Sequence, residues 1–234
     1  MSDVPASPAA PEPPSTPPAY DFGKPFSYVF DDPRWMPKVL LGGVFSFLSI
    51  VIIGWFFVLG YMARTARNIV AGMDEPLPEW ENLGEFFSEG ARLVAVAFCY
   101  ILPILVVSCF FVVPMILSDF ADDDFAFSMS GCFAGTLSCV IMPLSLLVFF
   151  FMPASLLFAA VEQRFGAAFE FGRIWAFIKA NIGNYLLAIV ILIIARFIGG
   201  LGFFLLCIGV FFTAFWASLI MTHGFAQAYK LARR

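Results

Sequence analysis

The chain has 234 residues, of which 61% are hydrophobic and 13% are charged, and its formal net charge is −4. Ordinary soluble domains are about 45–50% apolar and about 25% charged, so this composition excludes a soluble globular domain. The charges form no basic stripe interleaved with aromatic side chains, and we therefore expect no nucleic acid among the partners.

The chain begins with a proline-rich tail, which contains seven prolines before Tyr20. Such a composition cannot bury a core, and it predicts a disordered segment over residues 1–21. The tail lacks the basic start and apolar centre of a cleavable signal peptide, so the first spanning helix is expected to act as the insertion signal. Residues 22–38 then mix aromatic and charged side chains, as is typical where lipid headgroups meet water.

Five long apolar stretches occupy most of the remaining chain. A helix needs roughly 20 apolar residues to cross a hydrocarbon core of about 30 Å. The stretches predict spanning helices at 39–62, 91–117, 129–160, 184–200 and 203–229. The expected fold class is all-α, a polytopic transmembrane helical bundle of about five spans that fills residues 22–229 and precedes a basic C-terminal tail at 230–234.

Two polar segments between the spans are candidates for amphipathic in-plane helices. Asp74–Gly90 projects onto a helix with apolar side chains on one face and glutamates on the other. Glu162–Tyr185 repeats the pattern more weakly. Both places show the same order of a span, a polar turn with Arg, an aromatic-rich segment and a glycine. This order indicates a loose internal duplication, which is found in transporters and also in inert helical bundles.

The distribution of Lys and Arg near helix ends predicts the orientation in the membrane. With five spans, nine of them lie on the side of the C-terminus and four on the other, which also has a loop at 119–124 with four aspartates and no cation. We therefore expect a cell (cytoplasmic) membrane protein with a cytoplasmic C-terminus and an outward N-terminal tail. A re-entrant first segment would instead return the N-terminus to the cytoplasmic side, and this alternative stays open.

The sequence contains none of the common catalytic signatures, such as His-Glu-x-x-His, Gly-x-Ser-x-Gly or a phosphate-binding Gly-Lys-Ser/Thr loop. The five cysteines lie in or beside apolar runs without metal-ligand spacing, and we interpret them as small core residues. The single histidine, His223, could act as a proton relay, but an interfacial His bonded to a backbone carbonyl is the simpler interpretation. We expect no enzyme, no cofactor, and no catalytic, cofactor-binding or metal-binding residues.

Several short motifs are concentrated in the first 90 residues. They are Asp32-Pro33-x-Trp35, Gly42-Gly43, Gly60-Tyr61-x-x-Arg64-x-x-Arg67, Gly72, Leu77-Pro78-x-Trp80 and Gly90. With these motifs, residues 22–228 resemble a prokaryotic multi-pass membrane family, domain of unknown function 4013. The resemblance implies a helical protein with several spans, and it carries no activity.

The candidate lipid-headgroup or ion-pair residues are Arg64, Arg67, Trp80, Arg173 and Arg196. The first two lie at i, i+3 on one helix face, where they could reach lipid phosphates or pair with Glu81 or Glu85. Arg196 follows a long apolar run, and its side chain could extend to the headgroups or contribute to an anion site.

Gly131 and Gly135 form a Gly-x-x-x-Gly pattern that allows close helix packing, either within the chain or between two copies. The expected partners are membrane lipids, with a membrane protein or a second copy as further possibilities. We expect a non-enzymatic membrane protein that organises lipid or partner proteins through in-plane helices, because the spans contain almost no polar groups. A small transporter or transporter subunit built on the duplicated unit is the alternative.

Overall fold

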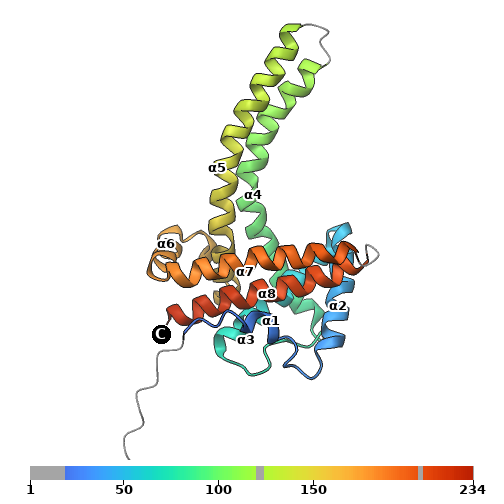
Figure 1. Ribbon diagram of the computed structural model, residues 1–234, viewed down its shortest axis with the longest axis vertical. Coiled ribbons are helices and arrows are strands. Elements are labelled where there is room, and N and C mark those ends of the chain that lie inside the picture. The colour runs from blue at the N-terminus through green and yellow to red at the C-terminus, as the bar shows by residue number, and fades with distance from the viewer. Residues whose placement is uncertain (1–18, 120–123, 205–207, 234) are drawn as a thin grey trace, which may run out of the picture.

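A computed structural model describes residues 19–119, 124–204 and 208–233, and these contain only helices and connecting turns (Figure 1). The elements in chain order are α1 (Lys24–Ser27), α2 (Trp35–Leu48), η1 (Ser49–Val51), α3 (Ile53–Ala71), α4 (Leu83–Asp119), α5 (Asp124–Glu162), η2 (Phe165–Phe169), α6 (Phe171–Ala180), α7 (Ile182–Leu201), η3 (Gly202–Phe204) and α8 (Gly209–Ala232). The predicted all-α class is confirmed. Most of the predicted tail, residues 1–18, lies outside the described residues, whereas the start of the predicted basic tail belongs to α8.

Among the described residues, four helices are long and apolar enough to cross a membrane. The qualifying stretches are Leu83–Val113, Gly135–Glu162, Ile182–Phe204 and Gly209–Ala232. They correspond to the last four predicted spans, and a shorter apolar helix, Trp35–Val51, covers part of the first. The prediction of an all-helical membrane protein with several helices long enough to span the bilayer is therefore confirmed.

The first predicted span, 39–62, is not one continuous helix. The chain leaves the helical path at Ile52, whose φ is 69°, and α3 begins at the next residue. The chain then folds back so closely that a Cβ at Gly54 would overlap the carbonyl oxygen of Phe45. Apolar composition predicts that a segment enters lipid, but it does not reveal a reversal of direction made inside an apolar run.

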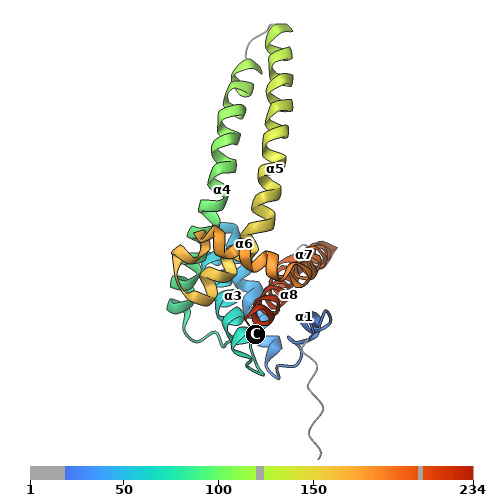
Figure 2. The ribbon, with the colours of Figure 1, turned by 90° about the vertical axis from the view of Figure 1, so that its left-hand side faces the viewer.

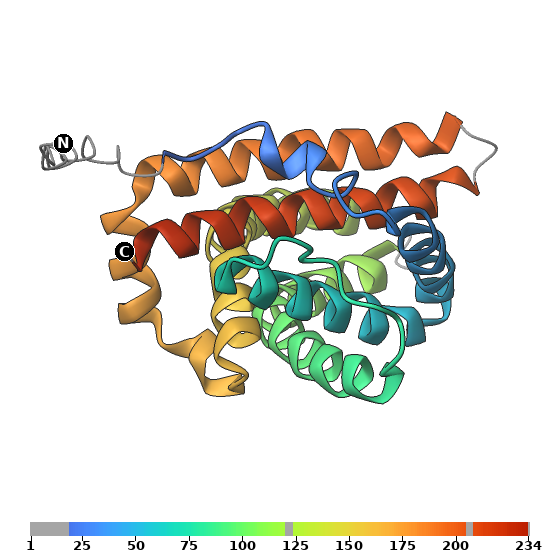
Figure 3. The same cartoon turned by 90° about the horizontal axis from the view of Figure 1, so that it is seen from below.

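Two helical hairpins dominate the architecture, and they lie crosswise. The α4–α5 hairpin rises out of the rest of the molecule, whereas the α7–α8 hairpin runs across its base (Figure 1). The view along α7 and α8 shows the first hairpin at full length (Figure 2), and the view from below shows α7 and α8 at full length while α4 and α5 are foreshortened (Figure 3). Only one of the two hairpins can therefore lie along the normal of a flat bilayer.

The segment that precedes α2 lies alongside the middle and the C-terminal half of α8. The Tyr20 hydroxyl donates to the carbonyl oxygen of Gly224 at 3.0 Å, and the Tyr28 hydroxyl donates to that of Leu219 at 3.1 Å. Five complete spans would separate these two parts of the chain by a bilayer. The expectation of an outward N-terminal segment with five spans is therefore wrong, and the contacts agree with the alternative of a re-entrant first segment.

The prediction of an in-plane helix over the whole of Asp74–Gly90 is also wrong. Gly72 ends α3 in the left-handed conformation, with φ 81°, and the chain remains irregular until α4 begins at Leu83. Pro76 and Pro78 disfavour helical geometry at the residues before them, which a helical projection does not take into account. Leu83–Gly90 instead forms the first turns of the long helix α4.

The second predicted in-plane segment does contain a short amphipathic helix, α6. Its buried face includes Ile174 and Ile178, and its exposed face includes Phe171 and Trp175. This helix lies at one end of the α7–α8 hairpin (Figures 1 and 2). The weaker of the two sequence patterns is therefore the one that forms a separate helix, because no proline interrupts it.

Helices α3 and α4 cross at two glycines that allow backbone contact. A Cβ at Gly60 would overlap the carbonyl oxygen of Phe86, and a Cβ at Gly90 would overlap that of Phe56. Both glycines belong to the sequence motifs noted above. They hold the long α4–α5 hairpin against α3.

We expect Gly60→Ala and Gly90→Ala each to lower the free energy of unfolding by about 1–3 kcal/mol or more, because the added methyl group meets backbone that cannot rotate away. Thermal unfolding of the detergent-purified chain, followed by circular dichroism, measures this loss. Gly84→Ala in the same helix is the matched control, since a Cβ there meets nothing within 4 Å. An equal loss of stability in Gly84→Ala and Gly90→Ala would contradict the assigned contact.

Candidate functional site

The two candidate arginines of α3 form ion pairs with the first turns of α4. The Nη2 atom of Arg67 lies 2.6 Å from both carboxylate oxygens of Glu89, and Arg64 pairs with Glu85. Of the partners predicted for these arginines, Glu85 is confirmed. Arg67 pairs with Glu89, which was not among the predicted partners and which lies one turn after Glu85 on the same face of α4.

Arg67 also connects a third helix to this contact. Its Nη1 atom donates to the carbonyl oxygen of Ala160 near the end of α5, at 3.1 Å. The side chains of Arg67 and Glu89 are only 19% and 10% exposed, so the pair is largely buried and each charge depends on the other. The network therefore holds α3, α4 and α5 together where the α4–α5 hairpin leaves the base.

A second network surrounds Lys38, which the sequence pattern had placed among the headgroups. Its ammonium lies 2.6 Å from the Asp32 carboxylate and 2.9 Å from Glu79, and it donates to the carbonyl oxygen of Leu77 at 2.9 Å. The side chains of Lys38 and Asp32 are only 3% and 1% exposed. The exposed Arg34 lies 2.9 Å from the same Glu79. Lys38 is thus a buried connector and does not lie in the solvent.

Trp80 lies over this network as a packing residue. Its indole nitrogen donates to the carbonyl oxygen of Lys38 at 3.0 Å, and its ring stacks on Tyr61 and Phe45 with centroids 4.3 and 4.7 Å apart. The Tyr61 hydroxyl donates to the carbonyl oxygen of Pro78 at 3.0 Å. The Leu-Pro-x-Trp motif therefore bridges α2 and α3.

We expect Lys38→Met to lower the free energy of unfolding by about 3–5 kcal/mol, because it leaves the buried Asp32 carboxylate without its closest cation. The double variant Asp32→Asn/Lys38→Met should lose less stability than Lys38→Met, since no charge of that pair remains buried. Arg34→Gln is the exposed control and should cost less than about 1 kcal/mol. Thermal unfolding in detergent measures all three, and a double variant as unstable as Lys38→Met would contradict the assigned pair.

The candidate Arg173 belongs to a third, exposed network at the junction of α5 and α6. It pairs with Glu162 and with Glu170, and Arg164 pairs with the same two carboxylates. The hydrogen bonds to Glu162 and Glu170 raise the pKa of the Arg173 guanidinium. Its guanidinium carbon also lies 5.1 Å from the centroid of the Phe158 ring.

The remaining candidates are less engaged within the chain. Arg196 is exposed on α7, and no ion pair to it occurs among the described residues. Gly131 and Gly135 lie in α5, and a Cβ at Gly135 would meet no atom within 4 Å. Packing of Gly135 against another helix of the same chain is therefore not observed, and the interpretation as an interface between two copies stays a prediction.

Three cysteines occupy positions that the sequence did not indicate. Cys99 and Cys109 on α4 and Cys139 on α5 are exposed on the surface of the chain. Their interpretation as core residues is wrong, because the α4–α5 hairpin has few neighbours to cover them.

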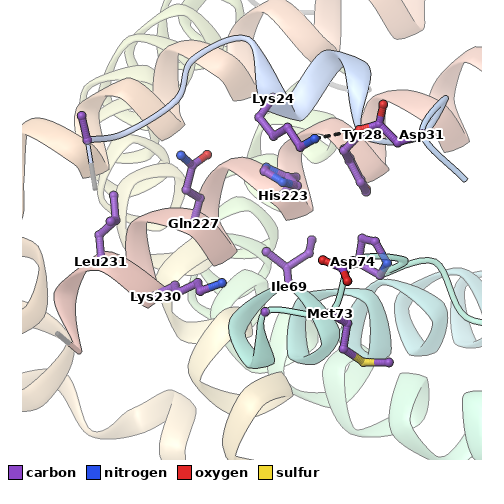
Figure 4. Close-up of a pocket in the computed structure, with 13 residues that line it drawn as sticks. Lys24, Tyr28, Asp31, Ile69, Met73, Asp74, His223, Gln227, Lys230 and Leu231 are labelled. Atoms are coloured by element: carbon purple, nitrogen blue, oxygen red, sulfur yellow. Dashed lines mark hydrogen bonds and ion pairs between the residues drawn. The ribbon is translucent and has the colours of Figure 1, made fainter. Parts of the chain in front are cut away.

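An open pocket of about 290 Å³ lies between the N-terminal segment, the end of α3 and the last turns of α8 (Figure 4). Its polar lining residues are Lys24, Asp31, Asp74, His223, Gln227 and Lys230. The His223 ring packs on Tyr28 with centroids 4.5 Å apart, and its Nδ1 atom is buried without a hydrogen-bond partner. The expected backbone hydrogen bond is thus absent at Nδ1. Sequence reasoning singled out only His223 among them, and it could not bring Lys24, Asp31 and Asp74 to this residue, because they come from remote segments.

These features define the class of the protein, a helical integral membrane protein with buried ion pairs at the base of an apolar hairpin. A family model described as "Protein of unknown function (DUF4013)" matches residues 44–208. This is more than half of the chain, so the protein belongs to that family, as its motifs predicted. The match is shorter than the expected 22–228, and it begins after the Asp32-Pro33-x-Trp35 and Gly42-Gly43 motifs. No curated protein and no solved structure matches the chain.

Proposed function

We propose that this protein is a non-enzymatic integral membrane protein that organises lipid from one face of the bilayer. In this arrangement the α4–α5 hairpin crosses the membrane. The base layer, which consists of α3, α7 and α8, lies along one interface. The observation that carries the proposal is the crosswise arrangement of the α4–α5 and α7–α8 hairpins (Figure 1).

Charged groups lie beside the C-terminal half of α8, where Lys24, Asp31 and Lys230 line one pocket with His223. Near the middle of α8, Leu219 accepts a hydrogen bond from Tyr28, in the same segment as the ion pair between Lys24 and Asp31. Because a charge at the centre of a spanning helix costs about 2.5–3.5 kcal/mol on insertion scales, the charged groups that line the pocket with His223 favour an α8 that lies along the interface.

The α4–α5 hairpin has the opposite character. Its apolar side chains face outward along both helices, among them Phe98, Val106 and Phe110 on α4 and Met142 and Leu146 on α5. Phe110 is 72% exposed. An apolar surface of this extent is stable in lipid and promotes aggregation in water, which supports this hairpin as the membrane-crossing element.

The arrangement also strengthens the charge asymmetry. Only the loop between α4 and α5 crosses to the far side, and residues 119–124 contain four aspartates and no Lys or Arg. All 13 Lys and Arg then belong to the near side, in place of the nine-to-four division for five spans. The positive-inside rule makes the side of the base layer cytoplasmic.

The transporter alternative gains no support from the buried hydroxyl groups of α3, α4 and α5. The Thr65 hydroxyl donates to the carbonyl oxygen of Tyr61 at 3.0 Å, and the Ser155 and Tyr100 hydroxyls bond to each other at 2.6 Å. These buried polar groups are satisfied by the protein, whereas a solute path needs groups that face the solute. Two crossing helices also enclose no pore within one chain.

Labelling of the two hairpin tips tests the arrangement. We expect Asp124→Cys at the start of α5 and Arg233→Cys after α8 to react with an impermeant maleimide from opposite sides of the membrane. Phe204→Cys, at the tip of the α7–α8 hairpin, should react from the same side as Arg233→Cys. The native cysteines are first replaced by alanine. A Phe204→Cys variant that reacts from the side of Asp124→Cys would contradict the in-plane base layer.

Reconstitution tests the function itself. The base layer adds area to one leaflet, and only two helices reach the other, so we expect vesicles that contain the protein to become smaller and more curved. Electron microscopy measures the size distribution, and Ile193→Glu, on the exposed apolar face of α7, should weaken the effect. Protein-dependent flux of ions or small solutes through the same vesicles would instead favour the transporter.

A further inference from the structure

We propose that the pocket beside His223 binds a small zwitterion, in which a phosphate and an ammonium are joined by two or three carbons. Phosphoethanolamine has this chemistry. The inference concerns a site other than the membrane-facing surfaces discussed above, and it goes beyond the proposed function.

The pocket is assembled from three parts of the chain that are remote in sequence. The N-terminal segment contributes Lys24 and Tyr28, the turn after α3 contributes Asp74, and the last turns of α8 contribute His223 and Lys230. The volume of about 290 Å³ is at the small end of ligand pockets, which limits the occupant to a compact molecule.

The imidazole of His223 supplies an unused polar atom in this pocket. The residue is 7% exposed, and Nδ1 has no hydrogen-bond partner. An unsatisfied buried polar atom costs about 1–3 kcal/mol, and a ligand oxygen that accepts from Nδ1–H would recover it. The adjacent Tyr28 ring, whose centroid lies 4.5 Å from that of the imidazole, limits rotation of the imidazole, so the nitrogen keeps its direction.

Two unneutralised charges of opposite sign face the same space. Figure 4 shows the Lys230 ammonium and the Asp74 carboxylate directed into the pocket from opposite sides, below His223. Neither forms an ion pair with another described residue, whereas Lys24 and Asp31 at the rim neutralise each other at 2.7 Å. A Cβ at Gly72 would lie 2.9 Å from the Lys230 nitrogen, so the glycine leaves room for the ammonium.

The complementary ligand therefore carries both charges. Its anionic end pairs with Lys230 and accepts from His223, and its ammonium pairs with Asp74. Phosphate suits the first position, because its several oxygens can accept from the ammonium and the imidazole at the same time. An anion alone would leave Asp74 unpaired, and a cation alone would leave Lys230 unpaired.

Isothermal titration of the full-length, detergent-purified chain with phosphoethanolamine tests the proposal. We expect saturable binding that weakens at least tenfold in Lys230→Gln and in Asp74→Asn. Inorganic phosphate alone and ethanolamine alone should each bind at least tenfold more weakly. Lys179→Gln is the matched control, since Lys179 lies over Trp175 on α6, outside the pocket, and should bind as the wild type does.

The outcomes separate the possible occupants. If nanodiscs of phosphatidylethanolamine compete with phosphoethanolamine and nanodiscs of phosphatidylglycerol do not, the site exists and its ligand is a lipid headgroup. If neither competes, the site exists and its ligand is the free compound. If inorganic phosphate binds as tightly as phosphoethanolamine, the assignment of a zwitterionic ligand is overturned. Absence of saturable binding, or folded variants that bind as the wild type does, would overturn the site, whatever the tip labelling shows.

Discussion

An ionised side chain is costly away from water unless a partner of opposite charge is within reach, and the arrangement of this protein follows from that constraint. Three ion-pair networks, around Lys38, Arg67 and Arg173, lie where helices meet at the base. They join α2 to the loop after α3, α3 to α4 and α5, and α5 to α6. The α4–α5 hairpin extends from this base with apolar side chains that face outward and need no charged partner.

The irregular segment between α3 and α4 is stable for a related reason. A non-helical backbone in apolar surroundings must find donors for its carbonyl groups. Here side chains supply them, since Asn68 donates to Pro76 at 2.9 Å, Lys38 donates to Leu77, and Tyr61 donates to Pro78. The prolines also remove two backbone N–H groups that would otherwise need acceptors. This segment replaces the in-plane helix that its amphipathic pattern predicted.

The N-terminal segment before α2 packs against α8 and also lines the pocket beside His223. Its tyrosines donate to backbone carbonyls of α8, and burial raises the pKa of both Tyr20 and Tyr28, so each hydroxyl remains a neutral donor. The same segment forms one wall of the pocket beside His223. A feature that resembled a headgroup-facing surface strip in the sequence is therefore part of the core and of the candidate binding site.

The sequence by itself determined the membrane class, the last four apolar helices and the motif glycines, because helix length, apolar content and the absence of a side chain are local properties. It also indicated that Arg64 could pair with Glu85. Only the tertiary structure decided that the first apolar run reverses at Ile52, that Lys38 is buried against Asp32, and that the two hairpins lie crosswise. These features depend on contacts between segments far apart in the chain, and neither hydrophobic periodicity nor charge counting contains information about which segments meet.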